Sequence, residues 1–183
     1  RRCWLARMKA PHRKTDYDLK LVEYAGVLVS VDARLPNPLL AEALQSRQLD
    51  AFQRYRGFDQ EVPLGKSRVD FRLATPKGPL WIEAKSVTLV EHGVALFPDA
   101  PTARGTRHLH ELVTAVGEGE QAAVVFVIQR PDAQRFHPHD KADPAFGKGL
   151  RLAASSGVGI YAWTCQVSTE AIVIAQRVPV ILA

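Results

Sequence analysis

Apolar and polar residues alternate along much of the chain in patterns that predict an α/β fold. Residues 68–74 (RVDFRLA) alternate polar and apolar side chains, as a half-buried strand does. The turn at 75–78 (TPKG) separates them from a second strand at 79–89 (PLWIEAKSVTL), so a hairpin is predicted. The continuous apolar run at 122–129 (AAVVFVIQ) predicts a buried central strand, and residues 158–165 (VGIYAWTC) predict another strand.

Three segments have the spacing of helices. The first opens at Pro36-Asn37-Pro38, with Asn37 as N-cap and Pro38 at the first helical position, and is predicted to end near Gln48. The second covers residues 102–116 and the third residues 143–156. The second helix is predicted to have an apolar and a polar face, formed by Leu109, Leu112, Val113 and Val116 against Arg104, Arg107, His108 and Glu111.

Shorter strands complete the prediction. Residues 19–31 (LKLVEYAGVLVSV) indicate two strands with a turn at Ala25-Gly26, residues 58–64 a weak strand and residues 171–178 the last strand. A loop is expected from Gly93 to Pro101. This succession of strands and helices predicts an α/β sandwich with a mixed central sheet.

The composition is that of an ordinary globular domain, with 46% hydrophobic and 23% charged side chains among 183 residues. Two cysteines, Cys3 and Cys165, are too few for a disulfide scaffold and indicate a reducing, cytoplasmic setting. No apolar run approaches the roughly 18 residues that span a bilayer. No apolar stretch follows the basic N-terminus as in a signal peptide, so membrane and secreted classes are not expected.

The net charge of +5 is concentrated in residues 1–20, and the rest of the chain is neutral overall. A basic segment of this kind either neutralises the phosphates of nucleic acid or forms a solvated edge of a domain. Further basic residues gather between positions 54 and 77 and favour the nucleic-acid interpretation. They are Arg54, Arg56, Lys66, Arg68, Arg72 and Lys77.

Three charged residues on the predicted hairpin form a candidate catalytic site. Side chains alternate along a strand, so Glu83 and Lys85 share one face. Asp70 lies on the neighbouring strand, where the hairpin register would set it opposite Glu83. Two carboxylates this close repel each other unless a cation lies between them, and hard oxygen ligands suit Mg²⁺ or Mn²⁺. With Lys85 to hold a water and stabilise negative charge, the pattern predicts metal-assisted phosphodiester hydrolysis.

The same residues also have simpler explanations. Charged residues two apart on a strand commonly form a solvent-facing ladder, and an Asp followed by Glu-x-Lys also occurs by chance. The strand at 79–89 is otherwise apolar, which favours a semi-buried site. On the second helix, Arg104, His108 and Glu111 form a polar stripe that faces either the site or solvent.

Several blocks of the sequence resemble the sugar fermentation stimulation protein A (SfsA) family. The blocks are SRVDF, IEAKSVTL, ALFPDAPTARGTRHLHEL and EGEQAAVVFVIQR, and the similarity extends from Asn37 to the end of the chain. The resemblance implies a PD-(D/E)XK, restriction-endonuclease-like domain at residues 35–183, which is a three-layer sandwich with a mixed central sheet. It also implies that residues 1–34 are the remnant of an N-terminal OB-like domain.

The resemblance assigns roles to individual residues. Asp70, Glu83 and Lys85 fall on the metal-ligand and lysine positions of that nuclease fold, and Glu42 falls on an acidic position of its first helix. Val69 stands where the motif has proline, and the family's opening strands, with an Asn-Thr-Gly stretch, have no counterpart. Family members are described as DNA-binding proteins linked to the regulation of maltose genes.

Two functions follow as hypotheses. In the first, the chain is a nuclease dependent on Mg²⁺ or Mn²⁺: Asp70, Glu83 and the Ala84 carbonyl bind metal, Lys85 positions the attacking water and Glu42 assists. In the second, it is a non-catalytic regulator of sugar genes that keeps the nuclease fold. A metabolic enzyme for phosphorylated sugars is disfavoured, because no Gly-rich phosphate loop is present.

DNA is the expected partner under both hypotheses, and a homodimer is left open. The side chains expected to contact DNA share a positive charge or the polar stripe of the second helix. They are Arg54, Arg56, Lys66, Arg68, Arg104, Arg107 and His108.

Overall fold

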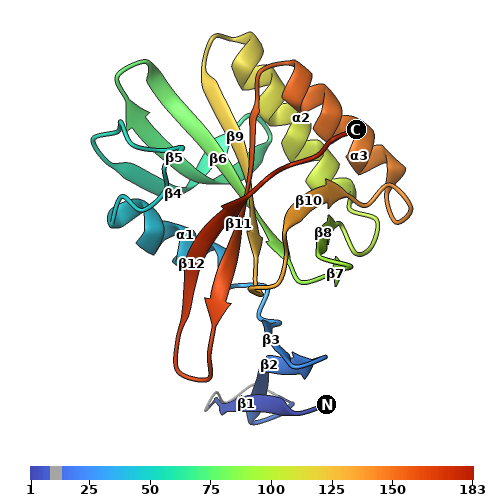
Figure 1. Ribbon diagram of the computed structural model, residues 1–183. Coiled ribbons are helices and arrows are strands. Elements are labelled where there is room, and N and C mark those ends of the chain that lie inside the picture. Colours follow the sequence, from blue (N-terminus) through green and yellow to red (C-terminus); the bar gives the residue numbers. More distant parts are fainter. Residues whose placement is uncertain (9–13) are drawn as a thin grey trace.

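The computed structural model describes residues 1–8 and 14–183. Lys9 and Arg13, which belong to the basic N-terminal segment, lie outside the described residues. Three strands form an antiparallel N-terminal sheet in the order β1-β2-β3: β1 (Cys3–Arg7), β2 (Tyr17–Tyr24) and β3 (Val27–Ser30). In Figure 1 this sheet projects from the α/β body at the end of the molecule that holds the N-terminus.

The hairpin between β2 and β3 confirms the predicted turn. Ala25 and Gly26 have φ values of 50° and 79°, the positive values that a tight hairpin turn requires. Strand β1, which was not predicted, pairs with β2 through a register shift between Trp4 and Leu5. The N-terminal segment is therefore a three-stranded sheet rather than a single hairpin.

A six-stranded mixed sheet forms the centre of the body, as predicted. Its strand order is β12-β11-β9-β6-β5-β4, and β6, β9 and β11 run parallel while the outer strands are antiparallel. The strands are β4 (Phe58–Leu64), β5 (Ser67–Thr75), β6 (Gly78–Val87), β9 (Gln121–Ile128), β11 (Gly159–Val167) and β12 (Ile172–Val178). Strand β9 is buried from Ala122 to Ile128, which agrees with its continuous apolar sequence.

Helices cover both faces of this sheet (Figure 1). Helix α1 (Pro36–Gln45) packs Leu40 and Leu44 on one face, in a core shared with Phe71. Helices α2 (Ala103–Gly117) and α3 (Pro144–Ser155) pack on the other face around Leu112 and Phe126. The body thus has three layers, and each face of the sheet has its own core.

A second small sheet corrects the predicted loop between Gly93 and Pro101. Strand β8 (Val94–Phe97) lies within that range and pairs with β7 (Val90–Glu91) and, in parallel, with β10 (Arg135–Pro138). These strands are short, and their pairing joins segments about forty residues apart, so local periodicity gives little sign of them.

Two details of the helices also differ from the prediction. Helix α1 begins at Pro36 and ends at Gln45, and its N-cap is Leu35 without a side-chain hydrogen bond, so Asn37 is not the cap. In α2 the buried positions include His108, which therefore does not lie on a solvated polar face. In both cases a tertiary contact of the side chain determines its place, as described below.

Within the described residues, no helix is long and apolar enough to cross a membrane. Cys3 is exposed and Cys165 is buried, and both are free thiols. Burial raises the pKa of the Cys165 thiol to about 12, so this residue is an inert core side chain at neutral pH.

Candidate functional site

The candidate site lies where β5 and β6 separate. The regular pairing of the two strands ends at the pair Phe71 and Ile82. Just beyond it, the Asp70 carboxylate accepts the backbone N–H of Ala84 at 2.7 Å and so bridges the two strands. The second Asp70 oxygen accepts from the Asn37 amide at 2.7 Å, which draws the first turn of α1 to the same point. Asp70 is thereby fixed from both a strand and a helix.

Glu83 lies on β6 beside the point where β5 and β6 separate. It is almost completely buried, with 3% of its surface exposed. Its Oε1 accepts from the Lys85 ammonium at 2.5 Å and contacts Nδ1 of His108. Its Oε2 is also buried and has no hydrogen-bond partner within residues 1–8 and 14–183. A buried acceptor is costly without a partner, so a hydrogen-bond donor or a cation at Oε2 would be stabilising.

His108 connects α2 to this carboxylate. Arg104, one turn earlier on α2, has its Nε 3.4 Å from Nε2 of the imidazole. An Arg guanidinium only donates hydrogen bonds, so Nε2 accepts and Nδ1 carries the proton that is donated to Glu83. The three residues form one chain of hydrogen bonds, which holds Glu83 in a single orientation.

The two carboxylates have opposite pKa shifts. Burial raises the pKa of Asp70 above its usual range, and the charge of Glu83 raises it further. Burial alone would also raise the pKa of Glu83, but the hydrogen bonds and charges of His108 and Lys85 outweigh this effect and lower it. Negative charge near Asp70 is therefore less compensated than at Glu83, and a cation there would relieve the repulsion.

A cavity of about 230 Å³ opens onto these groups. Its walls combine the two carboxylates with basic side chains from three segments, because Lys85, Arg34 and Arg104 all line it. Arg34 and Arg104 are exposed. The lining therefore combines carboxylates with cations, a combination that suits a metal ion together with a phosphate.

The structure brings together the central residues predicted from the sequence and separates others. Glu42 is exposed on α1 and does not line the cavity. Asn37 lines the cavity, and the residue one helical turn after it is Ala41, so Glu42 projects from a different side of the helix. Arg54, Arg56, Lys66, Arg68 and Arg107 are exposed but also lie outside the cavity walls. His108 is 3% exposed and contacts Glu83, so its imidazole is not available as a direct DNA contact.

Sequence reasoning missed Asn37 and Arg34 as site residues. Asn37 has the helix-opening context of a cap, and only the tertiary structure directs its amide to Asp70. Arg34 lies outside any periodic segment and is held by Asp32 and Asp18, with Nε–Oδ1 and Nη2–Oδ2 distances of 2.9 and 2.8 Å. A charged residue two positions before a predicted helix is the signal that could have drawn attention to it.

The donor set fits a hard divalent cation with an incomplete protein shell. Within residues 1–8 and 14–183, no group of three or more His, Cys, Asp and Glu side chains is placed to hold a metal. The site instead offers the two carboxylates of Asp70 and Glu83, and Oε2 of Glu83 has no hydrogen-bond partner among the described residues. Mg²⁺ and Mn²⁺ commonly use one or two carboxylates and complete their shell with water and phosphate oxygens, so two suffice.

Comparison with known proteins identifies the family. The family model described as "Sugar fermentation stimulation protein RE domain" matches residues 34–171. The chain belongs to the sugar fermentation stimulation protein family. The resemblance found in the sequence motifs is therefore confirmed.

Relatives within this family are similar over most of the chain. A sugar fermentation stimulation protein homolog of Moorella thermoacetica is 50% identical over 156 residues, which cover 85% of this chain and 67% of that protein. A homolog of Desulforamulus reducens is 46% identical over 168 residues, covering 92% and 70%. The solved structure of Pyrococcus furiosus SfsA in complex with Ca²⁺ has a TM-score of 0.89 and 28% identity, and the match covers 98% of this chain and 77% of that one.

Proposed function

We propose that this family member is a divalent-metal-dependent phosphodiester hydrolase of the PD-(D/E)XK nuclease fold that acts on DNA. The observation that carries the proposal is the buried Oε2 of Glu83, which has no hydrogen-bond partner among the described residues, in a residue that lines a cavity together with Asp70 and Lys85. The Ca²⁺ complex of the Pyrococcus furiosus relative supports a divalent ion as the missing partner. In this proposal the N-terminal sheet is part of an OB-like domain.

Asp70 and Glu83 would hold the cation, together with the Ala84 carbonyl. When bound, a divalent cation polarises the scissile phosphate and lowers the pKa of a coordinated water. Asn37 and the Ala84 N–H orient the Asp70 carboxylate, and His108 orients Glu83. These contacts already exist, so the ligands need little rearrangement to bind a metal ion.

Lys85 has the position of the water-binding and charge-stabilising group. Its ammonium donates one hydrogen bond to Glu83, and the remaining two N–H groups are available to the cavity that it lines. There it would orient the attacking water and stabilise the negative charge that develops on the phosphate as the P–O bond to the leaving strand breaks. Arg34 and Arg104 would hold neighbouring phosphates of the backbone.

The second candidate is a DNA-binding regulator of sugar genes that does not cut. The specific observation in its favour is the ion pair between Lys85 and Glu83, which already partly neutralises the site through a 2.5 Å contact. In that case the basic residues around the cavity would bind phosphates without reaction.

Cleavage of supercoiled and linear DNA with Mg²⁺, Mn²⁺ or EDTA separates the two candidates. We expect metal-dependent cutting that Glu83→Gln and Lys85→Ala each reduce by about 100-fold or more. Glu91→Gln is a matched control, because Glu91 is exposed and does not line the cavity. Salt-sensitive DNA binding with no cutting in either metal would overturn the nuclease and leave the regulator.

A further inference from the structure

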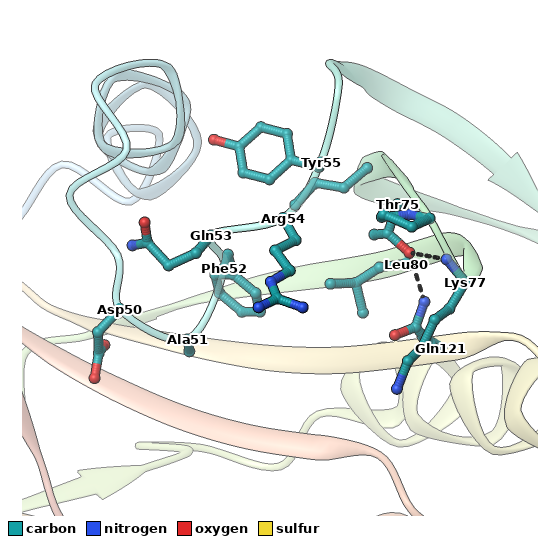
Figure 2. Close-up of a pocket in the computed structure, with 12 residues that line it drawn as sticks. Asp50, Ala51, Phe52, Gln53, Arg54, Tyr55, Thr75, Lys77, Leu80 and Gln121 are labelled. Carbon is teal, nitrogen blue, oxygen red and sulfur yellow. Dashed lines mark hydrogen bonds between the residues drawn. The ribbon is translucent and has the colours of Figure 1, made fainter.

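A second cavity, of about 390 Å³, lies on the α1 side of the central sheet (Figure 2). Its floor is apolar and consists of Phe52, Leu73 and Leu80, which belong to the core beneath α1. Leu73 follows Asp70 by three residues on β5, so the floor begins about 10 Å along the strand from the candidate metal site. This volume is within the range of pockets that bind small molecules.

One wall of this cavity is a loop held in place by its own contacts. Gln53 donates to the carbonyl of Leu49 at 2.7 Å, and the Tyr55 hydroxyl donates to the carbonyl of Leu44. The Arg47 guanidinium lies 3.6 Å from the centre of the Tyr55 ring. The wall is therefore formed before any ligand arrives, and binding would cost little ordering entropy.

The opposite wall is the hairpin turn between β5 and β6. Thr75 donates to the carbonyl of Gly78 at 2.7 Å and accepts the backbone N–H of Lys77 at 3.2 Å. The Gln121 amide, at the start of β9, donates to the same hydroxyl at 2.8 Å. Figure 2 shows this turn facing the loop that carries Arg54.

Two cations line the space between these walls. Arg54 and Lys77 are exposed, and within the described residues neither side chain has a hydrogen bond or an ion pair. The acidic lining residue, Asp50, is already paired with Arg177 at 2.9 Å. The cavity thus combines an apolar floor with positive charge that no carboxylate of the described residues neutralises.

We propose that this cavity binds a small phosphate monoester, with its phosphate between Arg54 and Lys77 and its apolar group against Phe52, Leu73 and Leu80. A phosphate monoester carries close to two negative charges at neutral pH and three acceptor oxygens, which match two separate cations. The apolar floor adds affinity for an organic group that inorganic phosphate lacks. This site does not depend on the proposed nuclease activity.

Calorimetric titration of the metal-free chain with phenyl phosphate tests the proposal. We expect saturable binding that Arg54→Ala and Lys77→Ala each weaken by about tenfold. We expect Lys77→Glu to abolish it, because the new carboxylate would pair with Arg54 and repel phosphate. Inorganic phosphate and benzyl alcohol are each expected to bind at least about tenfold more weakly than phenyl phosphate, because each lacks one half of the recognised structure.

Two control variants locate the binding. Arg56→Ala removes an exposed arginine two residues from Arg54 that does not line the cavity, and Arg104→Ala removes a cation of the candidate metal site. Both are expected to bind phenyl phosphate as the unmodified chain does. Equal binding by Arg54→Ala and the unmodified chain, or a loss in Arg104→Ala alone, would overturn the proposal.

The phosphate monoester could be a free small molecule or the phosphorylated end of a nucleic-acid strand. Competition of phenyl phosphate with a 5′-phosphorylated oligonucleotide, but not with its 5′-hydroxyl counterpart, would support the site and assign it to strand ends. Displacement by neither oligonucleotide, with binding still lost in Lys77→Glu, would support the site and assign it to free small molecules.

Discussion

Glu83 is held from two directions, and the difference between its two oxygens matters for the chemistry of the site. Lys85 and His108 both contact Oε1, whereas Oε2 has no hydrogen-bond partner in the part of the chain that the structure describes. The contact with His108 thus fixes the carboxylate without using the oxygen that would bind metal. Partners of this kind, which orient a ligand, commonly change metal affinity by 10–100-fold when they are lost.

His108→Leu is therefore expected to weaken the binding of Ca²⁺ or Mn²⁺ by about tenfold or more, measured by titration calorimetry. His108→Asn should retain most of the affinity, because the Asn amide can place an N–H near the position of Nδ1. A purely structural role would make both variants unstable and would not separate their metal affinities.

The control for this comparison is His110→Asn. His110 is on the same helix but exposed, so its replacement should leave metal affinity unchanged. If His108→Leu binds either metal as tightly as the unmodified chain does, the positioning role assigned to His108 is wrong.

Among the helices and strands, Asp143 joins two elements that support the site. One carboxylate oxygen caps α3 by accepting the Phe146 N–H at 2.9 Å, and the other accepts the N–H of Thr102 at 2.8 Å. Thr102 in turn caps α2 by accepting the N–H of Gly105. A single carboxylate thus stabilises the starts of both helices on the face of the sheet where His108 lies.

Asp143→Ala is expected to lower the free energy of unfolding by about 1–2 kcal/mol at neutral pH, measured with urea. The hydrogen bonds from the backbone N–H groups of Thr102 and Phe146 lower the pKa of Asp143 below its ordinary value of 3.8. The charged form is therefore the stabilising one, and its contribution is fully present above pH 3.8 and is lost as the pH falls through the lower folded pKa.

Repeating the urea measurement in acid checks the sign of this effect. The difference in the free energy of unfolding between the unmodified chain and Asp143→Ala should shrink as the pH falls below 3.8. The corresponding difference between Asp143→Asn and Asp143→Ala should change little with pH. A difference that grows in acid would contradict the assignment of the charged carboxylate as the cap.

The sequence predicts these elements well where a strict period and a local turn act together. The hairpin of β5 and β6 is an example, because the turn at 75–78 sets the register that brings Asp70 and Glu83 to the point where the two strands separate. Prediction from the sequence fails where a partner distant in the chain determines whether a strand forms or a side chain is buried. Strands β8 and β10 exist through their pairing with each other, and His108 is buried where its ring N–H donates a hydrogen bond to Glu83.

Over the whole molecule, the N-terminal sheet is tied to the edge of the candidate site. The backbone N–H of Ser30, at the end of β3, donates to the carbonyl of Gln129 at 3.0 Å, and the Gln129 amide donates to Ser86 at 2.7 Å. Arg34, which lines the cavity, donates to Asp18 of β2 at 2.8 Å. DNA that enters the cavity would therefore also pass near the segment of the chain with the net positive charge.

This arrangement predicts where the affinity for phosphates resides. Residues 1–20 carry the whole net charge of +5, while basic residues elsewhere are balanced by acidic ones. Arg7 and Lys14 are both exposed. The double variant Arg7→Ala/Lys14→Ala should weaken DNA binding at low salt. It should also reduce the magnitude of the slope of log K for DNA binding against log salt concentration by about two. The double variant Lys141→Ala/Lys148→Ala makes the same change in charge near α3, at the opposite end of the molecule, and should leave the slope unchanged. Equal slopes for the two double variants would mean that DNA does not follow the N-terminal sheet.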